Sequence, residues 1–151
     1  MERYSILDFE YDSNSSFKLI SILIACLPNE SKDLLYTNGI FIPTPTSKPP
    51  LFNYIFIKSL STFTTDEIIE KALKIQPIMV SQDSNYNKYL ILQELLKAMM
   101  NQISSLKTFF YTKTIQNISF VYFHGAKDCL TDLSIFSCNS DIYPEFFYQL
   151  S

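Results

Sequence analysis

The sequence has 151 residues and a mass of 17.5 kDa, which suits one compact domain or part of a larger protein. Hydrophobic residues make up 47% and charged residues 18%, so disorder is excluded for most of the chain. The only two glycines are Gly39 and Gly125, which excludes a glycine-rich phosphate-binding loop. The formal charge is −3 and the lysines are scattered, which argues against a nucleic-acid partner.

The cysteines and the apolar runs set further limits. Cys26, Cys129 and Cys138 are an odd number without C-x-x-C spacing, so we expect reduced thiols, no bound metal and no cofactor. The longest apolar run, over 17–27, is too short for the roughly 20 residues that cross a bilayer. Residues 1–16 are acidic, unlike the start of a secretory signal. We therefore expect a cytoplasmic or nuclear protein with no membrane contact.

The first half of the chain predicts helices. After the acidic lead-in of 1–16, apolar spacing predicts a helix from Ser15 or Ser16 to Leu27, and Pro28 ends it. A second helix over 31–38 has Gly39 just past its end, where a left-handed cap favours glycine. Prolines crowd the segment 43–50, which predicts an extended loop. These elements form a helical connector over 17–74.

Three more helices are predicted towards the middle of the chain. The apolar spacing over 51–60 suits a buried helix, and Thr64 with Glu67 forms a capping box for another, which Pro77 ends. The strongest pattern places apolar residues at 92, 95, 96, 99 and 103, after a plausible cap at Asn85. Met99 and Met100 are then expected to fill the core.

The segment 75–151 changes to short aromatic and aliphatic runs, over 106–111, 118–123 and 130–136, which predict strands. The last run fits the leucine-rich-repeat pattern LxxLxLxx(N/C), and weaker matches lie 27 and then 28 residues earlier. The three matches are Leu130-x-x-Leu133-x-Ile135-x-x-Cys138, Ile103-x-x-Leu106-x-Thr108-x-x-Tyr111 and Ile75-x-x-Ile78-x-Val80-x-x-Asp83. The alternative is an ordinary α+β domain.

We therefore predict an α/β fold in which a helical first half leads into a short, truncated leucine-rich-repeat-like solenoid. In such a solenoid each unit returns the chain to the same side, so the strands are parallel. Leu106, Leu133 and Ile135 should then point inward from parallel strands in adjacent units.

Three stretches carry a resemblance to a known family. They are Leu27-Pro28-Asn29-Glu30-Ser31-Lys32 continuing to Asn38-Gly39-Ile40, Pro50-Leu51-Phe52-Asn53-Tyr54, and the aromatic, leucine-rich run over 106–133. Over 21–151 the chain resembles the F-box and leucine-rich-repeat-like proteins expanded in arbuscular mycorrhizal fungi. The resemblance implies a connector and first repeats from a receptor whose F-box binds the adaptor of a cullin ubiquitin ligase and whose repeats hold the target.

The chain departs from that family at its F-box. Too few residues precede Ser21 for the F-box bundle. Leu27-Pro28-Asn29-Glu30 imitates the opening of the motif, but Ser31 follows where an aliphatic residue is expected, and the chain has no tryptophan. We therefore expect that this chain alone does not bind the adaptor.

The predicted function is a protein-interaction fragment of a ubiquitin-ligase receptor, with no catalytic residues. Its partners are other proteins of unknown identity. One alternative is a non-functional or purely structural truncated paralogue. A lesser alternative is a small cysteine enzyme that uses Cys129 with His124 and either Asp128 or Asp132.

The unfinished solenoid end should expose an apolar edge and promote self-association. This edge consists of Ile142, Phe146, Phe147 and Leu150.

Overall fold

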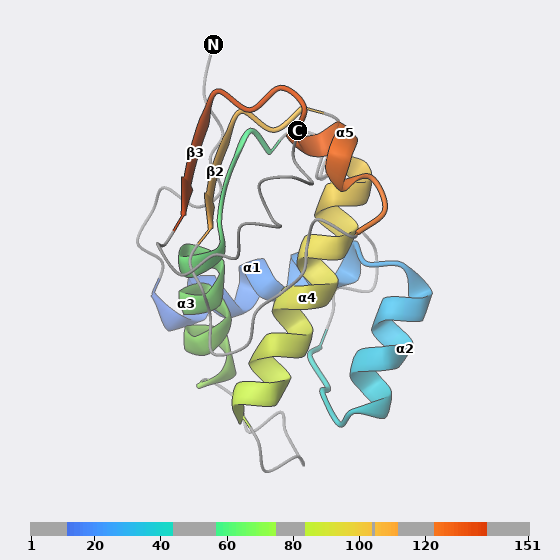
Figure 1. Ribbon diagram of the computed structural model, residues 1–151. Coiled ribbons are helices and arrows are strands. Elements are labelled where there is room, and N and C mark those ends of the chain that lie inside the picture. Colours follow the sequence, from blue (N-terminus) through green and yellow to red (C-terminus); the bar gives the residue numbers. More distant parts are fainter. Residues whose placement is uncertain (1–11, 44–56, 75–83, 104, 112–122, 139–151) are drawn as a thin grey trace.

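The computed structural model describes residues 12–43, 57–74, 84–103, 105–111 and 123–138 (Figure 1). It shows a mixed α/β protein with a helical first half and a small parallel sheet, as predicted at that level. In chain order the elements are α1 (Ser13–Ala25), α2 (Asn29–Thr37), β1 (Ser59–Ser61), α3 (Thr62–Leu73), α4 (Ser84–Gln102), β2 (Thr108–Tyr111), α5 (Ala126–Leu130) and β3 (Ile135–Cys138).

Several predicted features lie outside the described residues. They are residues 1–11 of the acidic lead-in, most of the proline-rich loop, residues 51–56 of the predicted helix with the stretch 50–54, the repeat match at 75–83, the strand over 118–123 apart from Phe123, and the apolar edge at 142–150.

Helix α1 begins earlier than predicted because Asp12 caps it. The Asp12 carboxylate accepts a hydrogen bond from the Ser15 backbone N–H at 2.7 Å, which satisfies a donor that the helix leaves unpaired. That same hydrogen bond lowers the pKa of Asp12. The helix buries Ile20, Leu23 and Ile24 and packs mainly against α3. It ends at Ala25, two residues before the predicted end.

Helix α2 ends in a Schellman motif, which confirms the glycine prediction. Gly39 has φ of 79°, and its N–H donates to Tyr36 O at 3.0 Å. The Ile40 N–H reaches back to Leu35 O, also at 3.0 Å. The turn folds the chain back over α2 and buries Leu35 and Ile40 together.

The predicted helix over 51–60 is wrong in its last residues. Residues 59–61 form β1, a strand that overlaps the end of the segment that the sequence predicts as helical. Ser61 ends the strand and caps α3, since its Oγ accepts the Thr64 N–H at 3.2 Å. Thr64 therefore lies inside α3 rather than capping it. Leu60 is buried, as the helix prediction also required, so its apolar character did not distinguish a helix from a strand.

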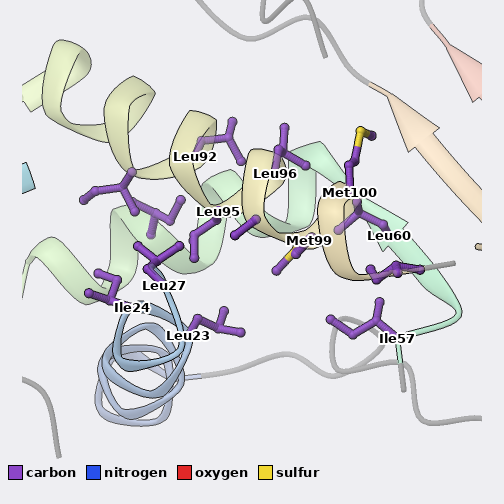
Figure 2. Packing of buried hydrophobic residues seen from close by; sticks show 14 of the residues in the cluster. Leu23, Ile24, Leu27, Ile57, Leu60, Leu92, Leu95, Leu96, Met99 and Met100 are labelled. Atoms are coloured by element: carbon purple, nitrogen blue, oxygen red, sulfur yellow. The ribbon is translucent and has the colours of Figure 1, made fainter. Parts of the chain in front are cut away.

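Helix α4 confirms the strongest sequence pattern and forms the centre of the core. It starts at Ser84, so Asn85 lies within the helix. Met99 and Met100 are 3% and 1% exposed and fill the core as predicted. Figure 2 shows its side chains facing those of α1 and of the segment around β1. The buried apolar residues of α4 are Leu90, Ile91, Leu92, Leu95, Leu96, Ala98, Met99 and Met100.

The sheet has the order β1-β2-β3, and both strand pairs are parallel. Thr108 pairs with Ile135 and Tyr111 with Cys138, so β2 and β3 pair at the offset between the last two repeat matches. This confirms the prediction of parallel neighbouring strands. Three short strands do not by themselves show a solenoid.

The predicted inward position of Ile135 is wrong. Leu106 is fully buried and Leu133 half-buried, but Ile135 is 53% exposed. Successive side chains of a strand point to opposite faces, and Phe136 takes the inward position beside Phe109, with ring centroids 5.9 Å apart. The strand therefore presents to the core the residue that follows the motif position.

Replacing Gly125 should destabilise the fold more than replacing Gly39. Its φ is 83°, and a Cβ there would lie 2.6 Å from Met100 O and 2.9 Å from Asn101 Cα. Gly39 has nearly the same φ, so Gly39→Ala should cost the left-handed penalty of roughly 1–2 kcal/mol. We expect Gly125→Ala to lower the free energy of unfolding clearly more in urea titrations. Equal losses for the two variants would contradict the close approach of Gly125 to α4.

Candidate interaction surface

One face of the sheet is open and is the first candidate surface. In register, Ser59, Thr108 and Ile135 form one row across the strands, and Ser61, Phe110 and Ser137 form the next. We call these six residues the outer sheet face. Phe110 is 40% and Ile135 53% exposed. The face therefore offers two large apolar side chains among small hydroxyl residues.

The opposite face of the sheet is buried and fixes the strands that carry these side chains. Leu60 and Phe109 are fully buried, and Tyr111 is 7% exposed. Helix α3 packs against β1 and β2 (Figure 1). Since strand side chains alternate, burial of Phe109 and Tyr111 holds Phe110 outward on a fixed backbone. The outer sheet face is thus built on rigid elements rather than on a loop.

The strands begin with a hydrogen-bond pattern that occurs twice. Lys58 O accepts from both Lys107 N and Thr108 N, at 2.9 and 3.1 Å. Lys107 O accepts in the same way from Ser134 N and Ile135 N, at 2.8 and 3.1 Å. The segment before β1 therefore accepts the same pair of hydrogen bonds from the start of β2 as the segment before β2 accepts from the start of β3.

The turns before β2 and β3 also correspond. Ser105 Oγ donates to Asp132 Oδ2 at 3.3 Å, and these residues are 27 apart, the same offset as the strand register. Ile103 and Leu130, at the same offset, are both buried where α4 and α5 end. The turns that lead into β2 and β3 thus lie side by side, at the offset of the strand register.

A second surface lies beside α2. A hollow of about 490 Å³ separates the helix from the chain that follows its Schellman turn. The rings of Tyr36 and Phe41 pack edge to face, with their centroids 4.8 Å apart. The two residues are 66% and 41% exposed. The lining residues are Ile24, Lys32, Asp33, Leu35, Tyr36, Ile40, Phe41, Ile42 and Pro43. This lining is mostly apolar, which suits an apolar group more than a charged substrate.

A buried hydrogen bond holds α2 against α4. Glu94 is 1% exposed, and its carboxylate accepts a bond from Ser31 Oγ at 2.7 Å. A buried carboxyl group without a donor is costly, so this contact makes the position of α2 specific.

The residues of the cysteine-enzyme alternative do not form a reactive centre. Cys129 is fully buried, and burial raises its pKa from the ordinary 9.0 to about 11. A nucleophilic cysteine needs a lowered pKa, because the thiolate is the reactive form. His124 and Asp128 are exposed, and Asp132 is bonded to Ser105. Cys129 therefore serves as a small core residue.

The other chemistry-bearing residues are dispersed. Cys26, Cys129 and Cys138 are free thiols. Across the described ranges, no three His, Cys, Asp or Glu side chains gather closely enough to hold a metal ion. Within those same ranges, no helix has the length and apolar character needed to cross a bilayer.

Sequence reasoning missed both candidate surfaces. Phe109, Phe110 and Tyr111 are consecutive aromatic residues, so their pattern does not reveal which ring faces out. The hollow depends on how the Schellman turn folds back, which spacing does not predict.

Comparison with known protein families, with curated proteins and with solved structures finds no match.

The Ser31–Glu94 contact predicts that substitutions at these two residues have coupled effects on stability. Ser31→Ala should lower the free energy of unfolding by about 1.5–3 kcal/mol, because it leaves a buried carboxylate without its donor. In a Glu94→Met background the same substitution should cost much less. Thr37→Ala, which removes an exposed hydroxyl bond, is the control. Additive effects of the two substitutions would contradict a specific contact.

Burial of Cys129 predicts that the free energy of unfolding depends on pH. The unfolded thiol ionises near its ordinary pKa, whereas the folded thiol keeps its proton until about pH 11. Between these values the unfolded state holds fewer protons, so stability should fall as pH rises above 9.0. Cys129→Ala should flatten this fall in urea titrations over that pH range. An unchanged slope would show that Cys129 ionises normally in the folded protein.

Proposed function

We propose that this chain is a protein-interaction module, part of the target-recognition region of an F-box ubiquitin-ligase receptor, with leucine-rich-repeat-like units that include β2 and β3. The observation that carries the proposal is the parallel pairing of β2 and β3 at the 27-residue offset, supported by the Ser105–Asp132 bond. An offset of this size lies within the range of leucine-rich repeats.

The repeated geometry favours binding over catalysis. Repeat proteins stack similar units and use the extended surface that results to bind partners. In this chain the outer sheet face presents Phe110 and Ile135 from neighbouring units, on strands anchored by a buried inner face. Aromatic side chains such as that of Phe110 are enriched at protein interfaces.

The partner is another protein, in the cytoplasm or nucleus. The formal charge of −3 gives little attraction to nucleic acid, whose binding depends on neutralising phosphates. Free thiols persist in these reducing compartments.

Phe110→Ser tests this proposal. We expect the variant to fold, because Phe110 is 40% exposed, but to lose partners that the wild-type chain retains in quantitative affinity purification from cells. Leu34→Ser is the matched control, since Leu34 is 39% exposed but lies on α2. Circular dichroism and thermal unfolding should confirm that both variants are folded.

The outcomes separate the alternatives. Partners lost with Phe110→Ser and kept with Leu34→Ser support the outer sheet face as the binding surface. A partner set that Phe110→Ser leaves unchanged overturns it. The absence of any specific partner for the wild-type chain supports a purely structural or non-functional fragment.

A further inference from the structure

Two lysines lie side by side where the strands begin. Lys107 N donates to Lys58 O at 2.9 Å, so the residues are direct neighbours on adjacent chain segments, and both are exposed. In the part of the chain that the structure describes, the ion pairs are those of Lys88 with Asp66 and Glu70, and neither Lys58 nor Lys107 has an acidic partner. Like charges directly opposite one another on paired strands are destabilising, and these two residues directly precede paired strands. The two lysines thus bring two positive charges to the place where β1 and β2 begin.

Exposed apolar side chains adjoin this pair of lysines. Ile135 N donates to Lys107 O at 3.1 Å, and Ile135 is 53% exposed. Phe110 lies one row along the outer sheet face, on the same side as Ile135. Asp132, in the turn before β3, accepts a hydrogen bond from Ser105 but keeps its negative charge, and the two lysines outnumber it. The two lysines and Ile135 therefore lie where the strands begin, and Phe110 lies two residues further along β2 than the partner of Ile135.

We propose that this end of the sheet binds a protein segment in which acidic residues flank an apolar residue. The inference rests on the proposed function and names the chemistry of its partner. Exposed ion pairs add little affinity, but complementary charge selects the partner and its orientation. The apolar contact with Ile135 and Phe110 supplies the affinity, and the acidic residues relieve the repulsion between Lys58 and Lys107.

A nucleic acid fits this surface less well. Phosphate backbones need several clustered basic residues, whereas the chain has a formal charge of −3 and offers two lysines here. An acidic protein segment needs only one or two contacts of this kind.

The test compares two synthetic peptides of the same length. In one, glutamates alternate with leucine and threonine, and in the other lysines replace the glutamates. Fluorescence anisotropy measures binding of each peptide to the full chain. We expect the acidic peptide to bind at least about tenfold more tightly, and its affinity to fall as salt is raised.

Lysine variants locate the interaction. Lys58→Gln combined with Lys107→Gln should weaken the acidic peptide about tenfold, which corresponds to about 1.4 kcal/mol. Lys97→Gln, at an exposed position on α4, should change nothing. The double variant should also unfold at equal or higher urea concentration than the wild type, because it removes a like-charge contact. Clear destabilisation would mean that the lysines serve the fold, and would overturn the proposal.

Further outcomes keep this inference distinct from the proposed function. Equal binding of both peptides, or of neither, overturns the acidic partner. Tighter binding of single-stranded DNA than of the acidic peptide also overturns it. If the lysine variants bind normally while Phe110→Ser abolishes binding, the outer sheet face remains the site and only its charge preference is wrong. If Phe110→Ser has no effect on peptide binding or on cellular partners, the proposed function itself fails.

Discussion

Burial of α4 on nearly all sides is the constraint on which the rest of the structure depends. A helix that is apolar around its circumference is stable only when other elements surround it. In the described chain α2, α3 and α5 pack on it. Leu95 and Leu96 are fully buried, and truncating such a residue to alanine typically costs 2–5 kcal/mol. The Lys88–Asp66 pair between α3 and α4 is partly exposed and contributes about 0–1 kcal/mol, so packing dominates.

The position of α4 determines where the sheet can lie. Its last turn meets Gly125, whose lack of a Cβ lets the chain pass against the backbone of Met100. Helix α5 follows directly and leads into β3, while α4 itself leads into β2. The two strands that present Phe110 and Ile135 are therefore positioned by the same helix end. The packing that stabilises the core therefore also positions the candidate interaction surface.

Polar contacts refine an arrangement that apolar burial stabilises. The Ser31–Glu94 bond lies within the apolar core and fixes α2, which buries Leu35 and exposes Tyr36. A buried carboxylate adds little net stability compared with a hydrocarbon, but it disfavours any packing that separates it from its donor. The Ser105–Asp132 bond is exposed and aligns two turns rather than stabilising a core.

The sequence by itself determined the features that depend on local chemistry. The α4 pattern, the left-handed Gly39 and the 27-residue offset all rest on spacing or on one residue's conformational freedom, and the structure has each of them. Tertiary packing decided the rest. Leu60 suits a helix or a strand, and Ile135 is apolar enough to face inward. Which choice is realised depends on distant partners: Leu60 lies in a strand beside Phe109, and Phe136 fills the place next to the same ring. Such contacts join residues far apart in the chain, so no local pattern contains them.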